Sequence, residues 1–276
     1  MLVKRVLTAA VLLAGFLAAI LLLGRPQFGI LVTLVIGAAA WEWGRLCRLR
    51  APRAALYAFV SGAAFAGLAA ALWPIDAGEM PEIAIFGAAA IFWIVAAPFW
   101  LGRGLERPES ALRPWILPVT GWLVLIPAGL AMLAVPGLHL LAILALIWIA
   151  DTAAYGAGRA FGRRKLAPHI SPGKTWEGVA GGMLGCAVYA AVLAAYTPKL
   201  AALTGGMRWV PYVGAALLLS AVSVVGDLFE SALKRRAGVK DSGSLLPGHG
   251  GVLDRIDSTT STLPVAVLLL YWAGVK

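Results

Sequence analysis

Long apolar runs make up most of the chain, and short polar stretches separate them. A membrane-spanning helix needs about 20 consecutive apolar residues, because the hydrocarbon core of a bilayer is about 30 Å thick. Nine runs approach that length, and we predict a helix in each: 6–23, 28–44, 54–73, 82–101, 115–135, 138–157, 177–197, 209–230 and 259–275. The pattern therefore predicts an all-α fold, a polytopic integral membrane helical bundle with about nine transmembrane helices.

The first apolar run, 6–23, resembles a signal peptide at first sight. Its 18 residues exceed the apolar region of about 7–15 residues that such peptides carry. No small-x-small cleavage site precedes Arg25-Pro26. We therefore expect a retained first helix. A tight turn at Pro136-Gly137 is expected to join the fifth and sixth runs.

Charged residues are few, at 13% of the chain, against about 25% in ordinary soluble domains. The net charge of +10 would suggest nucleic acid binding in a soluble protein, but here basic membrane loops explain it, and we expect no nucleic acid partner. With the N-terminus inside, 19 of the 23 lysines and arginines fall in inside segments. The positive-inside rule then predicts that loops 158–176 and 231–258 face the cytoplasm.

Polar chemistry is concentrated in the second half of the sequence. We expect one integrated bundle in which residues 1–135 form a scaffold and residues 136–276 carry the catalytic loops. Glu42 is the one conspicuous acid of the first half. We expect it to be an interfacial anchor paired with Arg45 or Arg48, rather than a functional residue. Cys47 and Cys186 form no disulfide or zinc pattern.

The first polar segment covers residues 148–178. Asp151 lies inside an apolar run, where an unpaired carboxylate is costly, so it indicates either function or a buried ion pair with an arginine. Gly173-Lys174-Thr175 resembles the end of a phosphate-binding P-loop, but Pro168 stands where that motif needs glycine. What remains is a Ser-Pro-Gly-Lys turn that opens a helix near Thr175, which suits an anion site.

The second polar segment, 226–258, carries acids at helical spacing. Asp227, Glu230, Ser231 and Lys234 would share one helix face, and Asp254 and Asp257 would point the same way. Carboxylates without a cysteine cluster favour Mg²⁺, and the neighbouring lysines and arginines would neutralise phosphate charge. These patterns predict a membrane enzyme that handles phosphates from the cytoplasmic side.

The same segment resembles a known family. Residues 231–258 contain S-x-L-K-R-x4-K-D-x-G-x2-L-P-G-H-G-G-x-L-D-R-I-D, which is similar to the signature of phosphatidate cytidylyltransferases, the CDP-diacylglycerol synthases. The bacterial enzymes of that family are also similar in D-T-A-A-Y-G-x-G-R-x-F-G-x-x-K-L-A-P-x-I-S-P-G-K-T-W-E-G and in the A-W-E-W around Glu42. The resemblance is strong over residues 148–258.

The resemblance implies transfer of a cytidylyl group from CTP to phosphatidate, by a homodimer in the bacterial cytoplasmic membrane. It implies Mg²⁺, with room for a second ion, divalent or K⁺. The implied metal ligands are Asp227, Asp254 and Asp257. The implied catalytic residues are Asp227, Lys234, Lys240, His249 and Asp254. The implied substrate-binding residues are Asp151, Ser171, Lys174, Ser231, Arg235 and Arg255. From spacing alone, His249 is equally consistent with a structural loop residue.

Two other functions compete with this interpretation. The first is a CDP-alcohol phosphotransferase, a family whose motif contains D-x2-D-G. Here Asp254 and Asp257 are followed by Ser258-Thr259 instead of glycine. An ion-coupled transporter predicts broken helices in two corresponding halves. The polar residues of this chain instead gather in its second half, which favours the cytidylyltransferase.

Overall fold

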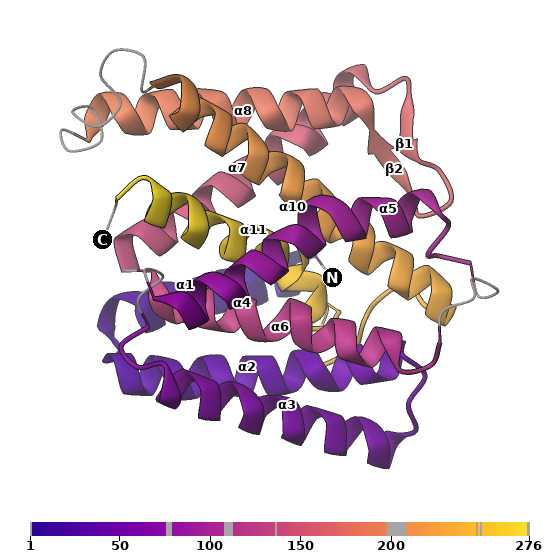
Figure 1. The fold of residues 1–276 in the computed structure, drawn as a ribbon. Helices are drawn as coiled ribbons and strands as arrows, with labels where there is room; N and C mark the ends of the chain where they lie inside the picture. Colours follow the sequence, from indigo (N-terminus) through magenta and orange to yellow (C-terminus); the bar gives the residue numbers. More distant parts are fainter. Residues whose placement is uncertain are drawn as a thin grey trace.

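The computed structural model describes residues 2–75, 79–107, 113–135, 137–197, 209–246, 248 and 250–274. Its helices are α1 (Leu2–Leu22), α2 (Arg25–Leu46), α3 (Ala51–Ala71), α4 (Met80–Ile91), the π-helix η1 (Phe92–Ala96), α5 (Ala97–Gly102), α6 (Ile116–Ala134), α7 (Gly137–Phe161), α8 (Trp176–Tyr196), α10 (Trp209–Ala237) and α11 (Leu253–Trp272). Figure 1 shows them packed side by side as a bundle.

Seven segments of the described residues are long and apolar enough to cross a membrane, with α4, η1 and α5 forming one of them, Met80–Gly102. The helices α1 and α11 occupy the two remaining predicted positions. The prediction of an all-α membrane bundle is therefore confirmed, with a helix in every predicted run. The expected turn residue Pro136 lies outside the described residues.

The boundaries of two helices differ from those that hydrophobicity predicts. α10 continues to Ala237 and α11 begins at Leu253, so both include charged residues beyond their apolar runs. Lys234, Arg235 and Arg236 lie in the last turn of α10, where positive charge is favourable beside unpaired carbonyl groups. Backbone hydrogen bonding thus extends both helices past the apolar part and brings the charged positions onto rigid elements.

A small β-hairpin, which the sequence did not predict, connects α7 to α8. Its strands β1 (Lys165–Ala167) and β2 (Ser171–Thr175) are antiparallel, with Lys165 opposite Thr175 and Ala167 opposite Ser171. α8 returns along α7 at close range (Figure 1). A Cβ added at Gly181 or Gly182 of α8 would overlap Ala157 or the Ala150 carbonyl oxygen of α7. Small residues therefore allow these two helices to pack backbone to backbone.

An aromatic cluster joins the first half of the chain to α10. Phe229 of α10 contacts Trp43 of α2, and the ring centroids are 6.4 Å apart. It also meets Phe92 and Trp93 of η1 edge to face, at 5.4 and 5.5 Å. The Trp43 indole N–H donates to the Leu117 carbonyl oxygen at 2.8 Å. This packing fixes the end of α2, where Glu42 lies, beside the helix that carries the acids.

Candidate active site

The hairpin presents Lys174 on strand β2, directly before the start of α8. Thr175 caps α8, because its hydroxyl oxygen accepts a hydrogen bond from the Gly178 N–H at 3.1 Å. The Glu177 carboxylate accepts from the backbone N–H groups of Arg163 and Arg164, at 3.1 and 3.2 Å. The prediction that a helix opens near Thr175 is therefore confirmed.

Lys174 meets the first acid of α10. Its ammonium nitrogen lies 2.6 Å from an oxygen of Asp227, and the two side chains are 24% and 31% exposed. The other Asp227 oxygen accepts from the Ser231 hydroxyl at 3.2 Å. Asp151 of α7 interacts electrostatically with both partners of this ion pair. The structure thus brings the two polar segments of the sequence together at one place.

A second ion pair links α10 to α11. The Lys234 ammonium nitrogen lies 2.6 Å from Asp254 and 3.1 Å from Glu230. These side chains are only 13%, 8% and 5% exposed, respectively. Neither Glu230 oxygen has a hydrogen-bond partner in the described residues beyond this ion-pair contact. Helical spacing in the sequence placed Glu230 on the same helix face as Asp227, but Glu230 was not among the implied site residues.

Asp257 lies on α11, one helical turn after Asp254. It interacts electrostatically with Asp227, Lys234 and Lys174, and its carboxylate accepts from the Ser258 N–H at 2.7 Å. A Cβ added at Gly226 would overlap Ser261 and the Asp257 carbonyl oxygen. α10 and α11 therefore approach closely at this level, which places Asp227 and Asp257 near one another.

The loop before α11 folds around the second oxygen of Asp254. That oxygen accepts from the backbone N–H groups of Ser242 and Gly251, at 3.0 and 2.8 Å. Gly250 has φ +80°, and a Cβ there would meet the Asp254 carboxylate at 2.7 Å. Leu246 and Gly250 close the turn with a backbone bridge. Asp254 is thus held by a lysine on one side and by the loop on the other.

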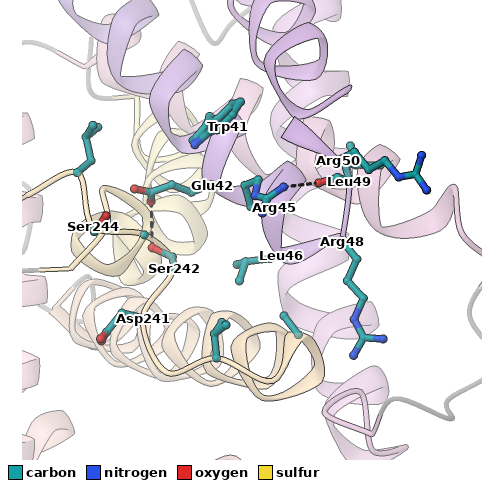
Figure 2. Close-up of a pocket in the computed structure, with 14 residues that line it drawn as sticks. Trp41, Glu42, Arg45, Leu46, Arg48, Leu49, Arg50, Asp241, Ser242 and Ser244 are labelled. Atoms are coloured by element: carbon teal, nitrogen blue, oxygen red, sulfur yellow. Dashed lines mark hydrogen bonds between the residues drawn. The ribbon is translucent and has the colours of Figure 1, made fainter. Parts of the chain in front are cut away.

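Glu42 contacts this loop, contrary to the sequence prediction. Its buried carboxylate accepts from the Ser242 hydroxyl at 2.9 Å and from the N–H groups of Val252 and Leu253, at 3.0 and 2.9 Å. Figure 2 shows Glu42 pointing to Ser242. The expected pairing with Arg45 or Arg48 is wrong.

Both arginines donate to backbone carbonyl oxygens instead, Arg45 to Leu49 and Arg48 to Arg236. Figure 2 shows Arg45 turned toward Leu49, away from Glu42. The charged groups beside Glu42 in the sequence are therefore engaged elsewhere, and the loop supplies its donors.

The remaining predicted residues lie around the same loop or the hairpin. Lys240 and Arg255 line a cavity of about 440 Å³ together with Gly248 and Gly250. Arg235 donates to the Ile170 carbonyl oxygen at 3.1 Å, which joins α10 to the hairpin next to Ser171. His249 lies outside the described residues. A larger cavity, of about 770 Å³, lies beside Glu42 and three arginines, away from the Asp227 ion pair.

Comparison with known proteins decides the family. The profile of the "Cytidylyltransferase family" matches residues 3–273. This chain belongs to the cytidylyltransferase family. It is 38% identical to a phosphatidate cytidylyltransferase of Pseudomonas aeruginosa, over 99% of this chain and 98% of that protein. It is 37% identical to one of Haemophilus influenzae, over 96% of each, and 48% identical to one of Bacillus subtilis over 45% of this chain and 44% of that protein. The resemblance in the sequence motifs is thus confirmed.

The donor set of this cytidylyltransferase-family site suits Mg²⁺ chemically. The cluster contains five acids and two lysines, namely Asp151, Asp227, Glu230, Asp254, Asp257, Lys174 and Lys234. Carboxylate oxygens are the ligands that Mg²⁺ prefers, and the Glu230 carboxylate, whose described contact is the ion pair with Lys234, has acceptor capacity left. Within the described ranges, however, no three His, Cys, Asp or Glu side chains converge as a metal site. The lysines occupy oxygens of Asp227 and Asp254 instead.

Proposed function

We propose that this enzyme transfers a cytidylyl group from CTP to phosphatidate, yielding CDP-diacylglycerol and pyrophosphate. The observation that carries the proposal is the cluster of two lysine–aspartate pairs at the ends of membrane helices, in a chain of the cytidylyltransferase family. Relatives that align over nearly the whole chain are named phosphatidate cytidylyltransferase.

In the proposed reaction, a phosphate oxygen of phosphatidate attacks the α-phosphorus of CTP. A new P–O bond forms, the bond between the α-phosphorus and the bridging oxygen of the β-phosphate breaks, and pyrophosphate leaves with that electron pair. The nucleophile is already an anion, so no strong general base is needed. The difficulty is to bring two polyanions together. Positioning of the two substrates and electrostatic stabilisation of their phosphate charges overcome this repulsion.

The lysines are placed for this task. We propose that Lys174 and Lys234 stabilise the phosphate charges. Lys174 would separate from Asp227 as phosphates arrive, whereas Lys234 would stay paired with Asp254. Lys240 and Arg255, which line the cavity of about 440 Å³, would bind the leaving pyrophosphate. His249 is proposed as a further catalytic residue because of the family motif. The other proposed substrate-binding residues are Asp151, Ser171, Ser231 and Arg235.

The carboxylates of Asp227, Asp254 and Asp257 would hold Mg²⁺, with a second ion, divalent or K⁺, beside it. When bound, the ion neutralises phosphate oxygens and favours departure of pyrophosphate. The carboxylate of Glu230, which also contacts Lys234, would add a further oxygen to the donor set. The acids otherwise orient the lysines.

The site is proposed to open to the cytoplasm in the bacterial inner membrane, because 19 of the 23 lysines and arginines fall on one side when the N-terminus is inside. Arg163→Cys and Ser244→Cys place thiols at exposed positions in the two polar segments. Both should react with an impermeant maleimide only after the membrane is opened. Labelling of either in intact cells would contradict this orientation.

The family resemblance also supports a homodimer that works among membrane lipids, with residues 1–135 as scaffold and residues 136–276 carrying the catalytic loops. We expect cross-linking of the protein in native membranes to give a band at twice the monomer mass. A monomer alone, across several cross-linker lengths, would exclude the dimer.

The activity test uses the full chain, purified in detergent with Mg²⁺, radiolabelled CTP and phosphatidate. We expect a lipid-soluble CDP product and equimolar pyrophosphate. Replacing phosphatidate by diacylglycerol removes the nucleophile and should abolish the product. A mixture of CDP-diacylglycerol and an alcohol substrate tests the CDP-alcohol phosphotransferase alternative. Absence of product from CTP and phosphatidate under all lipid and metal conditions would overturn the proposal.

A further inference from the structure

A carboxylate from the first half of the chain lies under the loop that forms the site. Glu42 is 2% exposed and accepts three hydrogen bonds from residues about 200 positions later in the sequence. We propose that Glu42 is a positioning residue, which acts on the carboxylate of Asp254 through Ser242 and the backbone of residues 251–253. This inference rests on the proposed function, because it takes Asp254 to be part of the active site.

The first step is the start of α11. Its N-cap residue is Val252, which makes no side-chain capping hydrogen bond. The first N–H groups of a helix have no partner within the helix and need one from elsewhere. Glu42 accepts from the N–H groups of Val252 and Leu253, and its negative charge is favourable at this end of the helix. A residue of α2 therefore caps the helix that carries Asp254.

The second step is that the same loop serves both carboxylates. Ser242 donates its hydroxyl to Glu42 and its backbone N–H to Asp254. Gly251 donates its N–H to Asp254, while the next residue, Val252, donates to Glu42. Displacement of the Glu42 contacts would shift the two N–H groups that hold Asp254. The orientation of Asp254 toward Lys234 thus depends on Glu42.

The third step is the close fit of the loop. A Cβ added at Gly243 or Gly251 would overlap the Glu42 carboxylate. The backbone therefore packs directly on this carboxylate at two points, which glycine alone permits. Because the backbone packs directly on the carboxylate, a change of that carboxylate should displace the loop.

Glu42→Gln removes the negative charge and one acceptor oxygen but keeps the size of the side chain. All three partners donate to Glu42, and they reach both carboxylate oxygens. Glutamine has one acceptor oxygen and one NH₂ group, so its NH₂ group must face the Val252 or Leu253 N–H. At least one cap contact is lost, whichever way the amide is turned.

The test compares Glu42→Gln with the wild type and with three other variants, all purified in detergent. Ser242→Ala removes one of the three contacts. Glu82→Gln is the matched control, since Glu82 is also buried, at 3% exposed, but lies in the first turn of α4. Asp254→Asn tests the assumption about the site. The measurements are kcat, KM for CTP, the Mg²⁺ concentration for half-maximal rate, and hydrogen exchange of the 250–253 amides.

For Glu42→Gln we expect about a 10- to 100-fold loss of kcat, the usual effect of removing a group that orients a ligand. We also expect a higher Mg²⁺ requirement and faster amide exchange. Ser242→Ala should change the same quantities less, and Glu82→Gln should match the wild type.

A folded Glu42→Gln with faster exchange but wild-type kcat and Mg²⁺ dependence would show a structural role only and overturn the inference. If that variant does not fold, unchanged kinetics in Ser242→Ala would overturn it equally. Failure of the proposed function looks different, because the wild type itself would then form no product. If the wild type is active and Asp254→Asn keeps full activity, the assumption that Asp254 belongs to the active site is wrong.

Discussion

The two lysine–aspartate pairs have the same N–O distance, 2.6 Å, but different surroundings. Lys174 comes from the hairpin, and its pair with Asp227 is about a quarter to a third exposed. Lys234 and Asp254 lie on packed helices, with Glu230 and two backbone N–H groups around them. A partly exposed pair contributes little to stability, whereas breaking a buried pair leaves an uncompensated charge.

The difference indicates that the two ion pairs have different roles in the site. The hairpin pair can separate at low cost, so we expect it to respond to the arriving phosphates. The pair between α10 and α11 is expected to stay fixed as a framework. Variants of the four residues distinguish these roles, since the first pair should affect turnover and the second should affect folding as well.

The largest effect is expected for Lys234→Met. It leaves Asp254 and Glu230 facing each other without a cation, and loss of one partner of a buried pair costs about 3–5 kcal/mol. Thermal unfolding in detergent, followed by tryptophan fluorescence, should show this loss together with loss of activity. Lys165→Met, at an exposed hairpin position, is the control. Equal stability of the two variants would show that the second pair is no framework.

Asp227→Asn should come next, with a loss of turnover but not of folding. We expect kcat to fall about 10²- to 10³-fold, the usual range for removing one electrostatic contributor. The free energy of unfolding should change by about 0.5 kcal/mol or less, as at other partly exposed positions. Rates at several Mg²⁺ concentrations provide the measurement. Near-normal turnover at all of them would remove Asp227 from the site.

Lys174→Met should act mainly on substrate affinity. We expect KM for CTP to rise about tenfold, equivalent to about 1.4 kcal/mol, with a smaller fall in kcat and stability changed by about 1 kcal/mol at most. Lys174→Arg keeps the charge and should recover part of the affinity. A loss of stability comparable to that of Lys234→Met would erase the contrast between the two pairs.

The smallest effect is expected from salt. Raising the salt from about 0.1 M to about 1 M shortens the Debye length from about 10 Å to about 3 Å. The difference in KM between the wild type and Lys174→Met should therefore shrink, while the stability difference between the wild type and Lys234→Met should persist. Parallel titrations of both variants provide the check. Equal screening of both differences would argue that the second pair is accessible to solvent.

The sequence by itself determined where the helices lie, and it directed attention to the acids of the candidate site. Bilayer thickness fixes the length of a spanning helix, so each predicted run corresponds to a helix of the structure. Charges are costly in apolar runs, which singled out Asp151 and Asp227. The three-residue spacing singled out Asp254 and Asp257. Helical spacing also correctly predicted neighbours one turn apart, as the contacts of Asp227 with Ser231 and of Glu230 with Lys234 show.

Only the tertiary structure decided which residues meet. The sequence did not predict the β-hairpin, the choice of Lys174 for Asp227 and of Lys234 for Asp254, or the contacts of Glu42. Glu42 was assigned to neighbouring arginines because local spacing informs only about residues one or two turns away. Its true partners follow 200 and more positions later. Packing of α2 against α10 brings them together, and such contacts depend on the whole bundle.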